Sequence, residues 1–168
     1  MTYIGKTMFL VAGLALAGCT SPSAYDDTNT VDFGNTLDTV DTTTLATNSP
    51  EYFSDTIGDR VLFEVDESTL NAEARALLTR QAGWLLDNQS YSALIEGHAD
   101  EQGTREYNLA LGARRASAVQ QYLIAQGVAP GRLRTVTFGK ERPLEICSQE
   151  ACYAKNRRAV TILGAGTS

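Results

Sequence analysis

From Asp59 to about residue 163, short β-type segments alternate with longer segments of helical periodicity. Such alternation within about 105 residues suits one compact domain in which a sheet and helices bury their apolar faces against each other. We therefore predict an α+β fold of two layers, with a four-stranded mixed sheet and helices packed on one of its faces. The four expected strands are residues 60–65, 91–96, 133–138 and 158–163.

Two segments between these strands carry apolar residues at every third or fourth position, which is typical of a helix with one buried face. The first follows Asn71, a favourable capping residue, and is expected to end near residues 87–88. The second follows Thr104 and is expected to stop at Gly127. The core is expected to include the large aromatic residues Trp84 and Tyr107.

Residues 1–18 have the features of a secretory signal peptide, because Lys6 precedes an apolar run that is too short to span about 30 Å of hydrocarbon. The run ends in Leu-Ala-Gly-Cys, which resembles the bacterial lipobox, so Cys19 is expected to carry anchoring acyl chains. Thr20 stands where the inner-membrane retention signal has Asp, so the resemblance implies an outer-membrane anchor and a domain facing the periplasm. The alternative is an ordinary signal peptide whose removal leaves a free thiol.

Residues 19–54 are rich in Thr, Asp, Asn and Ser and contain no Lys or Arg. Such a segment buries too little apolar surface to offset its ordering entropy, so we expect an acidic flexible tether. A structured arm is the alternative. The globular domain is then expected over residues 55–168.

The chain is acidic, with a net charge of −6 and a pI of about 4.8. This balance argues against nucleic acid as a partner. Cys147 and Cys152 enclose four residues, and a disulfide is the expected state in an oxidising periplasm, with a short helical turn near residues 151–155. A zinc site would need further ligands, and the chain has one His. We expect neither a metal nor a cofactor.

Several motifs follow one another in the domain. Residues 97–104 read Gly-His-Ala-Asp-Glu-Gln-Gly-Thr, residues 108–116 read Asn-Leu-Ala-Leu-Gly-Ala-Arg-Arg-Ala, and residues 156–160 read Asn-Arg-Arg-Ala-Val. Together they resemble the OmpA-like peptidoglycan-binding domains, and most closely those of the peptidoglycan-associated lipoproteins. The resemblance implies a protein that binds the peptide stems of peptidoglycan at meso-diaminopimelate, without catalysis.

The same resemblance implies a set of binding residues. Asp100 and Arg115 take the positions of the family's ligand clamp, and Asp66 takes that of an acidic contact after the first strand. Val65 replaces the family's usual Phe, and Gln102 replaces an Arg, so contacts from those two positions are in doubt. Further candidates are Asn108 and Leu111, which share a helix face with Arg115, and the strand residue Arg158.

Opposite charges suit this ligand, because the side-chain end of meso-diaminopimelate in a stem carries an ammonium and a carboxylate. Asp100 is expected to hold the ammonium, and Arg115 to hold the carboxylate in a two-bond fork. On this view, replacing either residue by Ala abolishes binding and leaves the unfolding midpoint nearly unchanged. The alternatives are a structural Asp100–Arg115 salt bridge, or Asp100 as a helix cap. His98 is expected to be a hydrogen-bonded structural residue.

The main rivals are an enzyme that cuts peptidoglycan and a protein-interaction module. A single His and paired cysteines leave few options for a hydrolytic centre. The resemblance implies binding to TolB and other Tol-system proteins as well as to the wall, with roles in envelope integrity and outer-membrane constriction at division. The alternative is an OmpA-like lipoprotein outside the Tol system that acts only as a structural wall tether.

Overall fold

The structure is a computed structural model that describes residues 45–165. The predicted signal peptide, the predicted lipidation site Cys19 and most of the predicted tether lie outside the described residues. Within the described part, no helix combines the length and the apolar character needed to cross a membrane.

The domain is built on one four-stranded sheet, in which β1 (Arg60–Leu62), β4 (Arg158–Ala165), β2 (Tyr91–His98) and β3 (Leu133–Gly139) follow one another in space. β4 pairs antiparallel with both β1 and β2, whereas β3 pairs parallel with β2. The sheet is therefore mixed, and the predicted fold class is confirmed. The first strand is shorter than predicted, because the chain leaves the sheet after Leu62 and turns at Asp66, which has a left-handed φ of 59°.

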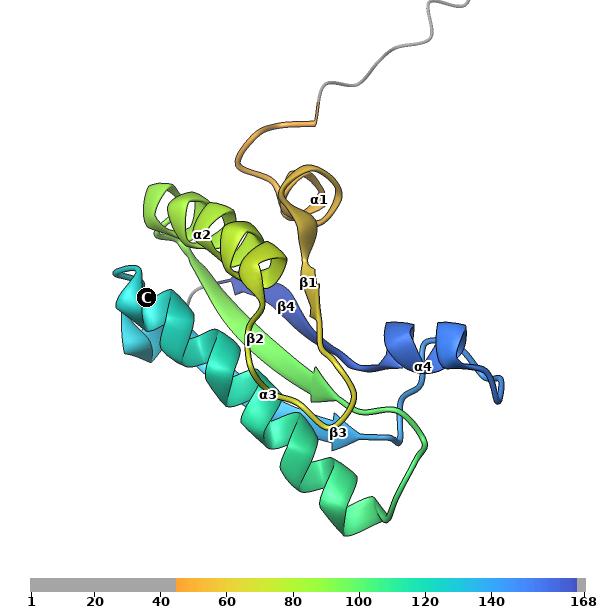
Figure 1. Cartoon of the computed structure of the whole chain (residues 1–168). Helices are drawn as coiled ribbons and strands as arrows, with labels where there is room; N and C mark the ends of the chain where they lie inside the picture. Colours follow the sequence, from red (N-terminus) through yellow and green to blue (C-terminus); the bar gives the residue numbers. More distant parts are fainter. Residues whose placement is uncertain (1–44, 166–168) are drawn as a thin grey trace, which may run out of the picture. The chain divides into compact units, whose positions relative to one another are not determined.

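Helices α2 (Ala72–Asp87) and α3 (Arg105–Ala125) pack on the same face of the sheet, as Figure 1 shows. Both predicted caps are present: the side chain of Asn71 accepts a hydrogen bond from the Ala74 N–H, and that of Thr104 accepts one from the Tyr107 N–H. A 3₁₀ turn (Pro130–Arg132) precedes β3, and α4 (Glu150–Asn156) precedes β4, near the expected position. The other face of the sheet exposes Leu62, Leu94 and Ile162.

Two glycines bring α3 into direct contact with the end of β2. A Cβ on Gly97 would lie 1.8 Å from the carbonyl oxygen of Gly112, and a Cβ on Gly112 would lie 2.4 Å from Oγ1 of Thr137. Any larger side chain at either position would push the helix off the sheet. This close approach fixes the start of α3 beside the loop that follows β2.

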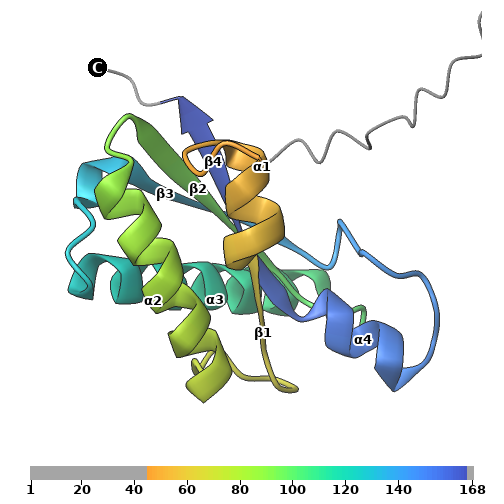
Figure 2. The same cartoon turned by 90° about the horizontal axis from the view of Figure 1, so that it is seen from above.

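The compact unit begins before the predicted boundary between tether and domain at residues 54 and 55. The segment before β1 forms α1 (Pro50–Tyr52) and a π-helical stretch, η1 (Phe53–Gly58), and belongs to the compact unit seen in Figure 2. Phe53 is 1% exposed and its ring lies 5.0 Å from that of Trp84, whose indole N–H donates to the Thr47 carbonyl. Burial of the Phe53 ring against Trp84 stabilises this segment on the domain, although its polar composition suggested a flexible tether.

Trp84 lies in the core as predicted, but Tyr107 does not: 43% of it is exposed. Cys147 and Cys152 form a disulfide that closes the loop before α4, with their Cα atoms 6.0 Å apart.

Candidate functional site

A hollow of about 240 Å³ lies where the loop after β2 meets the start of α3. We call it the Asp100 pocket. The loop after β1 forms its opposite wall. Its lining residues are Val65, Asp66, Asp100, Gln102, Gly103, Tyr107, Asn108 and Leu111. Four of the predicted binding residues (Asp66, Asp100, Asn108 and Leu111) are therefore brought together, although they come from three segments of the chain.

Asp100 is nearly buried, with 8% of its surface exposed, and both of its carboxylate oxygens are held. Oδ1 accepts a hydrogen bond from the Gln102 N–H at 3.2 Å, and Oδ2 accepts one from Nη1 of Arg157 at 3.2 Å. The charge partner of Asp100 is thus Arg157 and not Arg115. Thr104, and not Asp100, caps α3. Both of the structural alternatives considered for Asp100 are therefore wrong.

Arg115 is fully buried and does not line the pocket. Three of its five N–H groups donate to backbone carbonyls: Nε to Glu67 at 2.7 Å, Nη1 to His98 at 2.9 Å, and Nη2 to Glu64 at 3.0 Å. Burial lowers the pKa of Arg115 to about 10, with the charge of Asp100 acting in the opposite direction, so it stays a cation at neutral pH. Its charge therefore stands behind the pocket, where it also ties the loop after β1 to β2.

This burial changes the expected effect of replacing Arg115. A variant without the guanidinium would remove one donor from each of three carbonyls, so it would lose stability as well as any binding role. The expectation of an unchanged unfolding midpoint for Arg115→Ala does not suit this geometry.

The remaining pocket residues are themselves positioned by local hydrogen bonds. Asn108 is 1% exposed, and its Nδ2 donates to the Gln102 carbonyl at 2.7 Å, which fixes the loop after β2 against α3. The Tyr107 hydroxyl donates to Oδ1 of Asp66 across the mouth of the pocket. Sequence reasoning missed this contact, because Tyr107 was assigned to the core. Val65, which also lines the pocket, is 53% exposed.

Arg158 does not reach the pocket. Its guanidinium donates to the carbonyls of Asn156 at 3.3 Å and Arg142 at 3.2 Å, on the side of the sheet away from the helices. The arginine that bonds to Asp100 is Arg157 and not the predicted Arg158. Strand alternation could have indicated that Arg157 lies on the helix-covered face. Ala159, two residues further on, is an apolar residue that packs beneath the helices, and residues two apart in a strand share a face.

His98 is buried as a structural residue, but without the expected hydrogen bond. In the described part of the chain, neither ring nitrogen has a hydrogen-bond partner, although Nε2 lies 3.4 Å from Oε2 of Glu96. The ring stacks on Phe138 with centroids 5.6 Å apart. Burial, followed by the positive charges of Arg158 and Arg142, lowers the pKa of His98 to about 4. His98 is therefore neutral at physiological pH.

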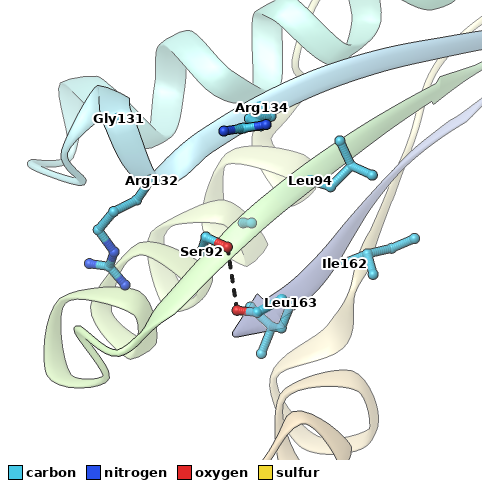
Figure 3. A pocket seen from close by; sticks show the side chains of 9 residues that line it. Ser92, Leu94, Gly131, Arg132, Arg134, Ile162 and Leu163 are labelled. Atoms are coloured by element: carbon cyan, nitrogen blue, oxygen red, sulfur yellow. Dashed lines mark hydrogen bonds between the residues drawn. The ribbon is translucent and has the colours of Figure 1, made fainter. Parts of the chain in front are cut away.

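A second hollow, of about 350 Å³, lies on the sheet face that the helices leave uncovered (Figure 3). We call it the open-face hollow. None of the predicted binding residues lines it, and its charged lining residues are Arg132 and Arg134. The Arg132 guanidinium donates hydrogen bonds to the carbonyls of Tyr91 and Asn88. Within residues 45–165, no three His, Cys, Asp or Glu side chains are grouped as they would be to hold a metal ion.

Comparisons with known proteins identify the family and agree with the fold. Residues 62–157 match the model of the OmpA family. The chain is 48% identical to a peptidoglycan-associated lipoprotein of Mesorhizobium japonicum, over 94% of this chain and 91% of that one. It is 46% identical to the protein of that name from Rhizobium meliloti, over 95% and 87%. The crystal structure of the peptidoglycan-associated lipoprotein from Burkholderia pseudomallei superposes with a TM-score of 0.65 at 36% identity, covering 69% of this chain and all of that one.

Proposed function

The chain belongs to the OmpA family, in the group of the peptidoglycan-associated lipoproteins, and from that premise we propose that its domain binds the peptide stems of peptidoglycan at the Asp100 pocket. The group consists of binding proteins and not of enzymes, and this chain is not an enzyme. The observation that carries the proposal is a nearly buried carboxylate, held in place on both oxygens, at the wall of a pocket that one charged side chain can enter.

The ligand group is the side-chain end of meso-diaminopimelate. Its ammonium bonds to the Asp100 carboxylate, which water solvates poorly at this depth. Its carboxylate lies in the positive potential of Arg115 and Arg157, both within electrostatic reach of Asp100. Leu111 and Asn108 form the inner wall that excludes longer or bulkier groups.

The energetics suit a reversible attachment. Charge-assisted hydrogen bonds contribute about 1.5–3 kcal/mol each. Two of them with additional backbone contacts give a total near 8 kcal/mol, which corresponds to a micromolar dissociation constant. Many copies bound to one wall would then hold a membrane to it without any single bond being permanent.

For the rest of the molecule we propose lipidation at Cys19 and an anchor in the outer membrane, with the domain in the periplasm. This arrangement would connect membrane and wall through an N-terminal tether. Cys19→Ser should move the protein from membrane to soluble periplasmic fractions, and unchanged membrane association would contradict the anchor.

We also propose that the protein acts within the Tol system, binding TolB and taking part in outer-membrane constriction at division. The proposal follows from the identity with relatives named peptidoglycan-associated lipoproteins over nearly their whole length. A pull-down with purified TolB separates it from the alternative of a wall tether outside that system. Retention of TolB supports the Tol role, whereas retention of sacculi alone would remove it.

Binding to the wall is tested by sedimentation of the protein with purified sacculi. Asp100→Asn keeps the size of the side chain and one of its two acceptor oxygens, and it removes the charge. Retention should therefore fall by more than about tenfold while the fold is kept. Asp87→Asn, the same change at an exposed residue at the end of α2, is the matched control and should bind like the wild type. Equal retention of both variants would contradict the Asp100 pocket as the binding site.

A further inference from the structure

We propose that Arg157 is a positioning residue for the Asp100 carboxylate, and that Glu150 and the Cys147–Cys152 disulfide hold Arg157 in place. Affinity for the ligand ammonium then depends on groups that do not touch the ligand. The inference rests on the proposed function and names the part of the chain that regulates the same pocket.

Arg157 is 4% exposed, and each of its three nitrogens has a different partner. Nε donates to the Phe63 carbonyl at 3.2 Å, Nη1 donates to Oδ2 of Asp100 at 3.2 Å, and Nη2 donates to Oε1 of Glu150. The planar guanidinium holds these three directions at fixed angles, which an ammonium does not do. The position of Asp100 is therefore tied to the position of Glu150 through one rigid group.

Glu150 is the first residue of α4 and sits at the protein surface, where 65% of its side chain is exposed. α4 has 7 residues, a length at which a helix has little stability of its own. The disulfide holds it near its start, since Cys152 lies within α4 and Cys147 in the preceding loop. Asn156 holds its other end, because Oδ1 accepts the N–H groups of Leu144 and Glu145.

The disulfide thus stabilises α4, whose first residue is Glu150. Glu150 orients Arg157, and Arg157 orients Asp100. With Oδ2 on Arg157 and Oδ1 on the Gln102 N–H, the carboxylate is fixed before a ligand arrives. Fixing a binding group in advance reduces the ordering cost of association. Loss of Glu150 or of the disulfide should therefore weaken the contact with the ammonium in particular, and leave contacts elsewhere on the ligand unchanged.

The test measures this selectivity by titration calorimetry on the full-length chain in detergent. The probes are the stem tripeptide ending in meso-diaminopimelate, and the same peptide with its side-chain amine acetylated. The ratio of their dissociation constants reports the contribution of the ammonium. A merely structural role for Arg157 would weaken both peptides by the same factor and leave the ratio unchanged.

The variants are Glu150→Gln, the double variant Cys147→Ser/Cys152→Ser, and two single replacements at Arg157, by Lys and by Gln. Glu150→Gln and the double Ser variant should each reduce the preference for the free amine about three- to tenfold. Arg157→Gln should remove most of that preference, and Arg157→Lys should restore part of it by keeping the charge. Since Glu150 is exposed, its variant keeps the inference testable if the buried Arg157 variants fail to fold.

The matched controls are Glu141→Gln and Arg105→Lys, which alter an exposed ion pair on the same side of the domain without a bond to Asp100. They should leave the preference unchanged. An unchanged preference in folded Glu150→Gln and in the double Ser variant would overturn the inference, and so would equal weakening of both peptides. Absence of binding by the wild type, or full binding by Asp100→Asn, would instead refute the proposed function itself.

Discussion

The Asp100 pocket and the open-face hollow are both small and both have arginines near them, yet only one is built to select a charge. In the pocket, a carboxylate lies at the wall, and two buried guanidinium groups stand behind it with their hydrogen bonds directed to the protein. In the open-face hollow, Arg134 is exposed beside Leu94 and Ile162, and the lining residues include no carboxylate among the described part of the chain (Figure 3).

The difference shows that the position of a charge in the hydrogen-bond network matters more than its presence. Buried charges on the helix-covered side hold loops and orient one another, and their loss has a high cost. Exposed charges on the open face are solvated and screened, and contribute little.

The largest expected effect is that of Arg115→Met. Three backbone carbonyls would each lose the hydrogen bond from Arg115, so the free energy of unfolding should fall by about 3–5 kcal/mol. Arg134→Met, the same change beside the open-face hollow, should alter it by less than about 0.5 kcal/mol. Urea denaturation of both variants provides the comparison, and losses of similar size would contradict the distinction between the two sides.

His98 is the second case, because its ring lies on the open-face side while its carbonyl holds Arg115. Its folded pKa of about 4 lies below its ordinary value of 6.5, so acid favours the unfolded state, which takes up the proton first. Stability from the neutral ring is complete above about pH 6.5 and is lost as the pH falls towards about 4, by up to about 3 kcal/mol.

The check is the pH dependence of the free energy of unfolding, compared with His98→Gln. The variant keeps the losses that arise from carboxylates and lacks the loss that arises from His98. Parallel curves for the two proteins between pH 4 and 6.5 would show that the buried ring does not titrate as described.

The disulfide comes next. Opening the loop between Cys147 and Cys152, which are 5 residues apart, frees a short segment of the unfolded chain. Replacing both by Ser should lower the free energy of unfolding by about 2 kcal/mol. The measurement is urea denaturation without reductant. An unchanged midpoint would mean that α4 is held by Asn156 and its loop contacts alone.

The smallest effect is expected from Glu141→Gln. Its carboxylate pairs with Nε of Arg105 at 3.0 Å, and both side chains are about half exposed or more, at 47% and 63%. Such pairs contribute about 0–1 kcal/mol and less in salt. Measured by thermal unfolding at low and high salt, the free energy of unfolding of the variant should differ from that of the wild type by no more than that amount. A larger loss would show that this exposed pair stabilises the fold as strongly as the buried charges do.

Much of the fold could be predicted from the sequence, because strand alternation, helical periodicity and the caps Asn71 and Thr104 are local signals. The segment before β1 was missed, since the burial of Phe53 depends on Trp84, which is distant in sequence. A polar composition does not reveal that one aromatic side chain has a partner elsewhere.

The pocket was predicted in part. Motif order grouped Asp66, Asp100, Asn108 and Leu111, and these four residues line one hollow in the structure. The motifs did not show that Arg115 donates its hydrogen bonds to backbone carbonyls. They also did not show that Arg157, and not Arg158, contacts Asp100. Both arrangements depend on the path of the loops after β1 and before β4. The contact between Tyr107 and Asp66 lies at the left-handed turn of Asp66. Asp adopts this conformation more readily than most residues, but its presence alone does not specify the turn.

The central claim is most directly tested by nuclear magnetic resonance of the ¹⁵N-labelled protein, titrated with the meso-diaminopimelate tripeptide. The account predicts that the backbone amides of Gln102, Gly103 and Asn108 shift saturably, and that those of Leu94, Arg134 and Ile162 stay in place. Shifts concentrated around Leu94, Arg134 and Ile162, or none at saturating peptide, would contradict it.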